Sequence, residues 1–452
     1  MSWEFFWWWF KFRTRNRSRT GFVTPSSPSV QSQTKAQTCG RGYKPRPALE
    51  LNFFLMNPKI FFHPELTKNL PPEVKKLFTI FGSEIRLVGG CVRDLILEKE
   101  MHDYDFATKF LPQEITKILE KNKIKAVPTG AKFGTITAVV NGKNFEITTL
   151  RKDLETDGRH CDPEFVDDYF LDAARRDFTI NALYLDSKGL VTDYFGGIYD
   201  LKNKKVKFIG DANLRIEEDF LRILRFFRFS CDYAEMLDVE GLKACVLQKK
   251  NLKKLSRERI RREFLKLILS EKKENLIVIL KVLKSKRIAA EIFTEEMDVE
   301  AFVRVAGENQ NLKLVALFLQ KNSDLKIFAK EICATNSEKK YFQFMIQNHD
   351  LSDLKRLLIF EEKNLVRDFY LLDFVKNFDP KKIPTVEKNL DFIQNFSAPI
   401  FPLNGNDVTS LGFKGSAVGK AIKQAKIFWI EGDFKTSKAD LICFLLGLKK
   451  TR

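Results

Sequence analysis

The sequence predicts an α+β fold, in which a small mixed β-sheet is followed by an all-α region that fills the rest of the chain. A short apolar run that ends in a Gly-Gly turn at residues 89–90, and two alternating stretches joined at Asn141-Gly142, indicate the sheet. Beyond Gly210 the apolar residues recur at helical spacing, which indicates helices. The β-rich part therefore precedes a longer helical part.

The composition favours a basic protein without a membrane span. Its 452 residues include 77 Lys and Arg against 59 Asp and Glu, a formal net charge of +18. Such a charge suggests a polyanionic partner, either nucleic acid or an anionic membrane surface. No stretch approaches the roughly 18 apolar residues that a membrane span needs. Seven scattered cysteines without a C-x-x-C pair favour reduced thiols over disulfides or a zinc site.

Residues 1–55 differ from the remainder, and we expect them to form a poorly structured N-terminal extension. They hold four of the five tryptophans and an Arg-, Ser- and Pro-rich tract. Such a tract is typical of a mitochondrial transit peptide, but it also fits untranslated sequence ahead of a start at Met56, which we prefer. The first reading predicts the mitochondrial matrix, and the second predicts a cytoplasmic protein.

The most informative stretch runs from Leu87 to Thr108. Its apolar run ends at Gly89 and Gly90 and a helix-like segment follows, which predicts a strand, a tight turn and a helix. Glycines let the backbone approach a ligand closely, and the N–H groups at a helix N-terminus favour an anion such as a triphosphate. Arg93 adds a guanidinium group one turn later.

Two carboxylates, Asp103 and Asp105, follow the turn. On a strand, residues two apart face the same side, where two bare carboxylates repel each other. A hard cation with oxygen ligands removes that conflict, most simply Mg²⁺ bridging to the phosphates of a nucleotide. Glu146, in the second of the paired strands, is a candidate third carboxylate, although a solvated strand glutamate is the commoner case.

Two polar segments lie between the paired strands and the helical region. We expect the stretch 151–172 to form a mobile loop beside the site. Adjacent arginines cannot share a helix face, so one member of Arg175-Arg176 is expected to reach a phosphate or ribose while the other pairs with an acid. Asp177 is expected to hold its neighbours by hydrogen bonds. The Lys/Val/Phe alternation before Gly210 predicts a last strand.

The charges of one apolar helix, predicted over 216–229, form the last candidate cluster. They recur at steps of three: Asp219, Arg222, Arg225 and Arg228. Charges on so apolar a helix need partners, and an ion-pair row is one reading. In the other reading, the acid and the arginine pair with the amine and ring nitrogen of cytosine or adenine and exclude uracil and guanine. A second helix, capped by Ser256, is expected to brace the first through Glu258, Arg259 and Glu263.

Taken together, these blocks resemble the class II tRNA nucleotidyltransferase and poly(A) polymerase family, within the polymerase-beta nucleotidyltransferase superfamily. The resemblance runs from about Leu87 to Leu269 and returns near Pro399 and Leu411. It rests on six motifs in the family's order: Gly-Gly-x-Val-Arg-Asp, the Asp pair, Arg-Arg-Asp, Asp-Tyr-Phe-Gly-Gly, Glu218-Asp219-x-x-Arg222 and Glu258-Arg259-x-x-x-Glu263. The polar loop and the Arg-Arg-Asp block are most similar to the alphaproteobacterial and mitochondrial branch.

The resemblance implies a polymerase-beta-like nucleotidyltransferase head with a five-stranded sheet, followed by helical parts. The implied division is a catalytic head at 56–210, a base-selecting neck at 211–270, and a body at 271–395 and a tail at 396–452 that bind tRNA. The implied reaction is template-independent: the tRNA 3′-hydroxyl attacks the α-phosphate of CTP and then ATP, pyrophosphate leaves, and the CCA end is built.

The resemblance also implies roles for individual residues. Asp103 and Asp105 would bind Mg²⁺. The nucleotide's phosphates or sugar would be contacted by Gly89, Gly90, Arg93 and Arg176. Base selection would fall to Asp219 and Arg222, supported by Arg225 and Arg228.

Three alternatives stay open at this point. A poly(A) polymerase and a partial enzyme that adds only CC or only A share the same scaffold. A non-catalytic RNA-binding protein is the third, although such a protein would not need both the metal carboxylates and the base-selecting pair. We expect the protein to act as a monomer or a homodimer.

Overall fold

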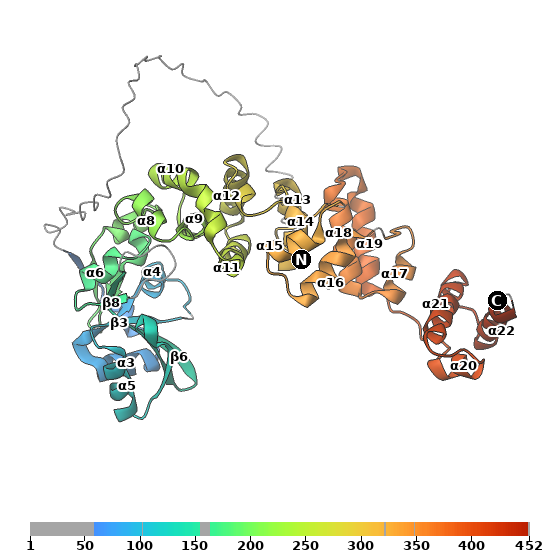
Figure 1. The fold of residues 1–452 in the computed structure, drawn as a ribbon, viewed down its shortest axis with the longest axis horizontal. Helices are drawn as coiled ribbons and strands as arrows, with labels where there is room; N and C mark the ends of the chain where they lie inside the picture. Colours follow the sequence, from blue (N-terminus) through green and yellow to red (C-terminus); the bar gives the residue numbers. More distant parts are fainter. Residues whose placement is uncertain (1–57, 102, 154–162, 321, 348, 451–452) are drawn as a thin grey trace, which may run out of the picture. The chain divides into compact units, whose positions relative to one another are not determined.

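The computed structural model describes residues 58–101, 103–153, 163–320, 322–347 and 349–450 (Figure 1). The predicted extension at 1–55 and the centre of the polar loop at 154–162 lie outside them. The chain divides into two compact units, one ending at Ile292 and one beginning at Phe293. The finer division into head, neck, body and tail stays a prediction.

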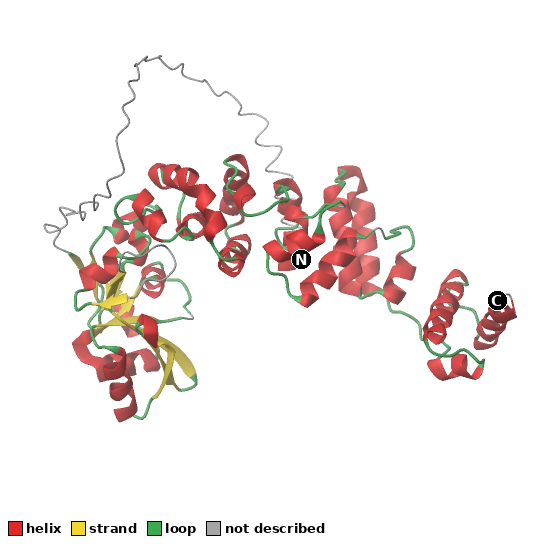
Figure 2. Ribbon diagram, viewed as in Figure 1, coloured by secondary structure: helices red, strands yellow, loops and turns green. Residues whose placement is uncertain are grey.

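A mixed β-sheet forms the centre of the first unit, and eight of the described strands take part in it. These strands, yellow in Figure 2, are β1 (Lys59–Phe62), β2 (Ile85–Val88), β3 (Asp105–Thr108), β4 (Lys125–Gly130), β5 (Thr135–Val140), β6 (Lys143–Thr149), β9 (Leu183–Leu185) and β10 (Leu190–Asp193). Their order is β1-β10-β9-β2-β3-β6-β5-β4. Neighbours run antiparallel except β3 and β6, which are parallel.

The sheet has more strands than the five that the resemblance implies, and this expectation is wrong. The two edge strands explain part of the difference, because β1 and β4 bury little and so lack the alternation of a half-buried strand. β4 also contains Pro128, which is tolerated at an edge because it leaves no ladder hydrogen bond unmade. A separate two-stranded ladder joins β7 (Arg151–Asp153) to β8 (Pro163–Phe165), so the loop predicted over 151–172 is wrong for the described residues at its two ends.

The helices of the first unit cover both faces of the sheet and then continue beyond it. They are α2 (Glu65–Lys68), α3 (Pro72–Phe81), α4 (Gly90–Ile96), α5 (Pro112–Lys121), α6 (Tyr169–Ala174), α7 (Gly197–Lys202), α8 (Ala212–Glu218), α9 (Arg222–Tyr233), α10 (Val239–Gln248), α11 (Arg257–Ile268) and α12 (Lys273–Ser285). Leu87 packs with α3 and α5 on one face, whereas its neighbour Val88 packs with α6 on the other. Successive residues of β2 thus contribute to two hydrophobic cores, one on each face of the sheet.

Two local predictions about the sheet have opposite outcomes. The hairpin is confirmed: Asn141 and Gly142 join β5 to β6 with φ of 50° and 77°, as a two-residue turn of this kind requires. The prediction of a last strand before Gly210 is wrong, because only the isolated bridge between Phe178 and Phe208 forms. The chain leaves the extended conformation directly after Phe178 and enters the short 3₁₀ helix η5 (Thr179–Asn181).

The helix predicted over 216–229 is also wrong, because the chain breaks into α8 and α9. Asp219 has φ −153° and ψ 104°, an extended conformation between the two helices. Its Oδ1 accepts a hydrogen bond from the Leu221 backbone (3.1 Å), and its Oδ2 accepts one from Arg259 of α11 (2.8 Å). The apolar period continues through the break, so the sequence pattern alone does not reveal it.

The second unit is helical throughout its described residues, as expected. Its helices are α13 (Val299–Arg304), α14 (Gln310–Phe318), α15 (Leu325–Glu331), α16 (Asn336–Ile346), α17 (Leu354–Phe360), α18 (Lys363–Lys376), α19 (Ile383–Asn395), α20 (Gly405–Ser410), α21 (Ser416–Glu431) and α22 (Lys438–Lys450). One core cluster gathers residues of α17, α18 and α19, and another gathers residues of α20, α21 and α22. Of the helices that the structure describes, none is long and apolar enough to cross a membrane.

Candidate active site

The Gly89-Gly90 turn joins β2 to α4, as the sequence predicts. Gly89 has φ 76° and ψ −125°, which other residues rarely adopt. A β-carbon there would lie 3.1 Å from Nη1 of Arg176, so the glycine also makes room for this arginine. Because α4 spans only seven residues, its dipole is short, and the positive charge at the turn comes mainly from arginine side chains.

A cleft of about 410 Å³ opens beside this turn, and it brings the sheet and the helical region together. It is lined by Gly89, Gly90, Arg93, Asp105, Arg175, Arg176, Asp177, Asn181, Asp219, Arg222, Arg225, Arg228 and Phe229. Nine of the eleven predicted site residues are in this set. Asp103 and Glu146 are the two that do not line the cleft.

The candidate carboxylates belong to the start of β3, to its partner β6 and to the segment before β3. Asp105 is directly opposite Glu146 in the parallel pairing of β3 with β6. The expectation that Asp103 shares the strand is wrong, since β3 begins at Asp105. The ladder ends there because its partner β2 turns into α4 at Gly89. Asp103 lies in the preceding irregular segment, but its charge still acts on Asp105.

The electrostatics of this corner fit a divalent cation bound together with a substrate. Loss of water in the cleft and the nearby charge of Glu146 raise the pKa of Asp105 to about 6; Arg176 acts in the opposite direction, and Asp103 adds to the rise. Within the described residues, no three acidic, His or Cys side chains lie close enough to enclose a metal. The protein carboxylates are oxygen donors that suit Mg²⁺, and substrate phosphates would complete its coordination.

Arg176 is held at the turn by a buried acid. Its Nη2 donates to Asp172 Oδ2 (3.0 Å), and its Nε donates to the Tyr184 hydroxyl (3.3 Å). Arg175 also donates to Asp172, through Nε (2.8 Å), so the expectation that only one of the adjacent arginines would pair with an acid is wrong. Both can reach Asp172 because it lies three and four residues before them at the end of α6.

Arg93 is fixed by a different set of partners. It donates to both carboxylate oxygens of Asp94 through Nε (3.0 Å) and Nη2 (2.7 Å), and to Asn181 Oδ1 through Nη1 (2.5 Å). The ring of Tyr233, from α9, lies 4.0 Å from its guanidinium carbon, and the Tyr233 hydroxyl donates to Asp94. Arg93 is 5% exposed, so it presents little surface to a ligand.

The helical side of the cleft carries the predicted base-selecting pair. Arg222 donates through Nη1 to Glu218 (2.5 Å) and to the Arg215 carbonyl, and through Nη2 to the Arg175 carbonyl. Asp219 is bound to Arg259 instead. The acid and the arginine therefore pair with other groups and not with each other.

The expected bracing of α9 by α11 is confirmed for Glu263, whereas Arg259 binds Asp219 ahead of α9. Glu263 accepts a hydrogen bond from Arg228 Nε (2.7 Å), and its other oxygen lies 3.6 Å from Arg225 Nη1. Arg225 also donates to Asp177, the last residue of the Arg-Arg-Asp run (2.7 Å). The Ser256 hydroxyl caps α11 at the Arg259 backbone N–H, as predicted. This chain of ion pairs ties the sheet side of the cleft to its helical side.

Sequence reasoning did not find several residues that hold the site together: Asp94, Asp172, Asn181, Tyr184 and Tyr233. For Asp172 a local signal existed, because an acid three and four residues before two arginines matches helical spacing. For Tyr184 and Tyr233 no local signal existed, because their partners are distant in the chain.

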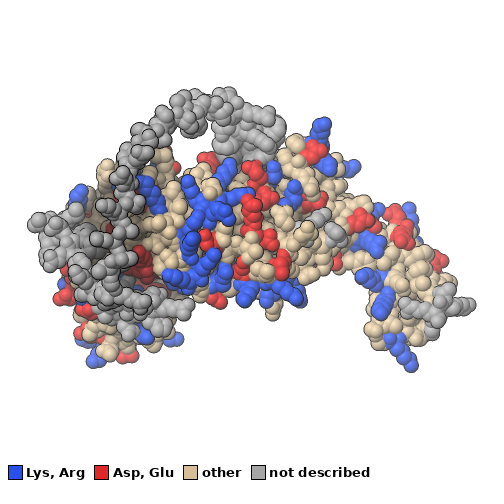
Figure 3. Space-filling model, turned by 45° about the horizontal axis from the view of Figure 1, so that its top comes forward, with Lys and Arg blue, Asp and Glu red and all other residues tan. Residues whose placement is uncertain are grey.

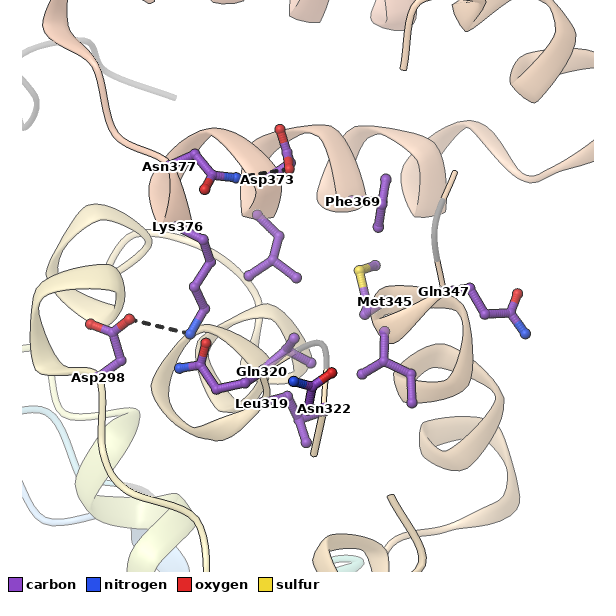
Figure 4. A pocket seen from close by; sticks show the side chains of 13 residues that line it. Asp298, Leu319, Gln320, Asn322, Met345, Gln347, Phe369, Asp373, Lys376 and Asn377 are labelled. Carbon is purple, nitrogen blue, oxygen red and sulfur yellow. Dashed lines mark hydrogen bonds and ion pairs between the residues drawn. The ribbon is translucent and has the colours of Figure 1, made fainter. Parts of the chain in front are cut away.

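A second cavity, of about 380 Å³, lies within the second unit (Figure 4). Its one lysine, Lys376, donates to the Ala316 carbonyl (2.8 Å) and lies 3.3 Å from Asp298 Oδ2. None of the predicted site residues lines it. Its size is similar to that of the cleft, but its lysine is already paired with Asp298, and it contains none of the clustered arginines that line the cleft.

Comparison with known proteins points to one family. Residues 85–207 match the family model of the poly A polymerase head domain. The protein "CCA tRNA nucleotidyltransferase 1, mitochondrial" of Danio rerio is 34% identical over 381 residues, which cover 80% of this chain and 87% of that relative.

Solved structures share the fold over most of the chain. A Bacillus stearothermophilus CCA-adding enzyme in complex with CTP has a TM-score of 0.66 at 24% identity, covering 85% of this chain and 99% of its own. A tRNA nucleotidyltransferase complexed with a primer tRNA and an incoming ATP analogue has a TM-score of 0.56 at 22% identity, covering 72% of this chain and all of its own. The α+β architecture predicted from the sequence is confirmed.

Proposed function

Because the chain belongs to the family of CCA tRNA nucleotidyltransferases, its activity is CCA addition to tRNA, and we propose here which of its residues carry the reaction. Its substrates are CTP, ATP and tRNA. The observation that carries the proposal is the single cleft that is lined by Asp105 of the acidic corner, by a cluster of arginines and by the pair Asp219 and Arg222. Each of the three groups suits one part of the substrate.

The acidic corner holds Mg²⁺ through Asp105 and Asp103, with Glu146 beside them. The cation, when bound, neutralises charge on the transferring phosphoryl group and promotes ionisation of the attacking hydroxyl. Support comes from the raised pKa of Asp105, which burial raises most and the charges of Glu146 and Asp103 raise further, because a bound cation would relieve both the burial of charge and the repulsion. Asp105 is the carboxylate that lines the cleft, and Glu146, its neighbour across the strand pair, is a third carboxylate beside the cation.

The arginine cluster binds the triphosphate. Arg176 reaches the Gly89 turn with Nη1, which donates to no described residue, so this nitrogen is available to a phosphate oxygen. Arg93 supports the turn from behind, since its guanidinium is buried against Asp94 and Asn181. Gly89 and Gly90 let the phosphates come close to the backbone.

Asp219 and Arg222 select the base. An acceptor beside donors matches the amine and ring nitrogen of cytosine and adenine, whereas uracil and guanine would leave polar groups unpaired. Both residues are engaged elsewhere in the structure, Arg222 with Glu218 and Asp219 with Arg259. Binding of a base would therefore exchange these partners, which suits a site that accepts two different bases in turn.

The basic surface binds the tRNA backbone. Figure 3 shows Lys and Arg side chains gathered in patches on the face that it presents. Exposed cations are dense around α11 and α12: Lys253, Lys254, Arg262, Lys266, Lys272, Lys281, Lys284, Lys286 and Arg287. Contacts of this kind position a nucleic acid without reading its sequence. Oligomeric state stays a prediction, as a monomer or homodimer.

The mitochondrial reading of the N-terminal extension gains support from the comparisons. The Danio rerio relative is named as a mitochondrial protein. Together with the Arg- and Ser-rich tract at 1–55, this favours the mitochondrial matrix over the cytoplasm. A fusion of residues 1–60 to a fluorescent protein would be imported if the extension is a transit peptide, and would stay in the cytosol if it is not.

Incorporation assays test the proposed function. Purified protein is incubated with tRNA transcripts that end before CCA, after C and after CC, with labelled CTP, ATP and Mg²⁺, and products are resolved by single nucleotides. Complete addition that stops at CCA on all three transcripts is expected. Arrest after CC or addition of A alone would identify a partial enzyme, long A tails a poly(A) polymerase, and no incorporation an RNA-binding protein.

A further inference from the structure

We propose that Tyr184 and Asp172 are positioning residues that fix the Arg176 guanidinium against the Gly89 turn, so that its free edge meets the triphosphate. This inference rests on the proposed function, and it extends that function to two residues that never touch the substrate. Neither residue lines the cleft. Their effect on the reaction would pass entirely through Arg176.

The three side chains form a closed triangle of hydrogen bonds. Asp172 Oδ2 accepts from Arg176 Nη2 (3.0 Å) and from the Tyr184 hydroxyl (2.7 Å), and the same hydroxyl accepts from Arg176 Nε (3.3 Å). Two of the three guanidinium nitrogens are therefore fixed on the side away from the cleft. Because the guanidinium group is planar, fixing Nε and Nη2 also fixes the direction in which Nη1 points.

The remaining nitrogen is aimed at the predicted phosphate site. Nη1 lies 3.1 Å from the position that a β-carbon would take at Gly89, and no described residue accepts a hydrogen bond from it. Gly89 needs its positive φ for the turn and also leaves the space that this nitrogen occupies. The turn and the arginine are therefore matched parts of one surface.

The triangle is anchored on two elements, the helix α6 that precedes Arg176 in the chain and the strand β9. Asp172 belongs to α6 and is 1% exposed, and its second oxygen is occupied by Arg175. Tyr184 belongs to β9, is fully buried, and has its ring edge-on to Tyr169 at 5.3 Å. Since a buried, paired side chain has little freedom to rotate, Arg176 is oriented before a nucleotide arrives.

Protonation states favour the same arrangement. Burial raises the pKa of Tyr184 well above its usual value, so its hydroxyl stays neutral and donates to the carboxylate. Burial would raise the pKa of Asp172 as well, but Arg176 and Arg175 lower it below its usual range. The acid therefore remains charged and keeps both arginines throughout the neutral pH range.

A purely structural role is the alternative, because a buried aspartate needs partners whatever the site does. The two roles differ when only the Tyr184 hydroxyl is removed. Tyr184→Phe keeps the ring and leaves Asp172 bound to both arginines, so the fold has little reason to change. Arg176 loses one of its two fixed points and can swing about the other.

The experiment compares Tyr184→Phe with the matched control Tyr169→Phe. Tyr169 lies in the same core cluster, and its hydroxyl donates to the Glu84 carbonyl (3.2 Å), away from the triangle. Both variants lose one buried hydroxyl, so similar shifts of Tm are expected. Only Tyr184→Phe is expected to raise KM for CTP and for ATP, roughly three- to ten-fold, as for loss of one hydrogen bond.

A phosphate-only probe separates positioning from base recognition. Inorganic tripolyphosphate carries no base, so its binding to the protein with Mg²⁺, measured by calorimetry, should weaken by the same factor in Tyr184→Phe. A double variant, Tyr184→Phe with Arg176→Lys, should bind no more weakly than Arg176→Lys alone, because the hydroxyl acts through the guanidinium.

The outcomes distinguish this inference from the proposed function. Unchanged tripolyphosphate affinity in Tyr184→Phe, with a Tm shift like that of Tyr169→Phe, would overturn the positioning role while leaving CCA addition intact. If the wild-type protein binds tripolyphosphate but adds no nucleotide, the proposed function fails and the binding comparison still decides the positioning role. Absence of tripolyphosphate binding in the wild-type protein would overturn the positioning role directly.

Discussion

Two arginines that line the cleft, Arg176 and Arg222, are held in different ways. The partners of Arg176 lie behind it, are buried, and leave Nη1 facing the Gly89 turn. Arg222 has both terminal nitrogens occupied, and one of its partners, Glu218, is 46% exposed. An exposed carboxylate can return to water at little cost, whereas Asp172, at 1% exposure, cannot. Arg176 is therefore held by a buried partner and Arg222 by an exposed one, which suits the proposed roles of a rigid phosphate side and an exchangeable base side.

This difference matches what the reaction asks of each side. Every incoming nucleotide has the same triphosphate, so the arginine that binds it can keep one fixed orientation throughout the reaction. The base changes from cytosine to adenine during one round of addition, so the group that reads it must release and rebind. Five predictions test this comparison, from the largest expected effect to the smallest.

Loss of the charge at Asp105 should lower the activity more than any other change, because Asp105 lies where the phosphoryl group is transferred. Asp105→Asn is expected to lower kcat by about a thousandfold or more, since the cation would lose its protein ligand nearest the cleft. Single-turnover incorporation of labelled CTP measures it. Glu120→Gln, which removes one exposed carboxylate on α5 and does not line the cleft, is the control for charge alone. Near-normal kcat in Asp105→Asn would remove Asp105 from the catalytic residues.

Removal of Arg176, the arginine that is oriented before a nucleotide binds, should weaken the binding of CTP and ATP to the same extent. Arg176→Ala is expected to raise KM for CTP and ATP by roughly ten- to a hundredfold, the worth of a charge-assisted hydrogen bond. The ratio between the two nucleotides should stay constant. A change confined to one nucleotide would mean that Arg176 reads the base and that the comparison is wrong.

Removal of the exchangeable arginine should affect discrimination more than affinity. Arg222→Ala is expected to reduce the preference for CTP over UTP, measured as kcat/KM, by roughly tenfold, because the base would lose its donors. Binding of tripolyphosphate should not change. If Arg222→Ala weakened the binding of tripolyphosphate as much as Arg176→Ala does, Arg176 and Arg222 would not have separate roles.

The raised pKa of Asp105 predicts a pH-dependent requirement for metal. Below its pKa of about 6, the carboxyl binds a proton that must leave before a cation binds. The Mg²⁺ concentration that gives half-maximal activity should therefore rise roughly tenfold for each pH unit below 6 and stay nearly constant above 7. A flat Mg²⁺ requirement between pH 5 and 8 would contradict this assignment.

The smallest effect is expected at the exposed partner of Arg222. Glu218→Gln replaces a charged acceptor with a neutral one, so Arg222 is released more easily and KM for CTP and ATP should fall by about two- to threefold. Glu217→Gln, at a neighbouring exposed position on α8, is the control and should leave KM unchanged. A rise in KM would show that Glu218 supports the base site instead of competing with it.

The sequence predicted the parts of this site whose cause is local. Gly89 marked the turn because few other residues tolerate its backbone conformation, and Asn141-Gly142 marked the hairpin for the same reason. The spaced motifs placed nine residues in one cleft correctly. In each case the residue type or the spacing already carried the structural information.

The parts that escaped prediction have distant causes. The break between α8 and α9 depends on Arg259, forty residues beyond Asp219, and the apolar period gives no sign of it. Asp103 left the strand because its neighbour β2 ended, not because of its own sequence. Tyr184 looked like an ordinary strand residue, and only the fold brings its hydroxyl to Arg176. In each of these cases the local structure depends on residues that are distant in the sequence, so the local pattern could not predict it.

The parallel pairing of Asp105 with Glu146 has a consequence for the order in which the protein becomes competent during synthesis. Parallel neighbours need a long crossover, and here α5, β4 and β5 must all be made before β6 can dock beside β3. Tyr184 follows later, and Arg259 and Glu263 later still. A ribosome that has released the chain only as far as α9 therefore presents a cleft with unbraced charges, and we expect nucleotide binding to begin only after α11 has emerged and folded.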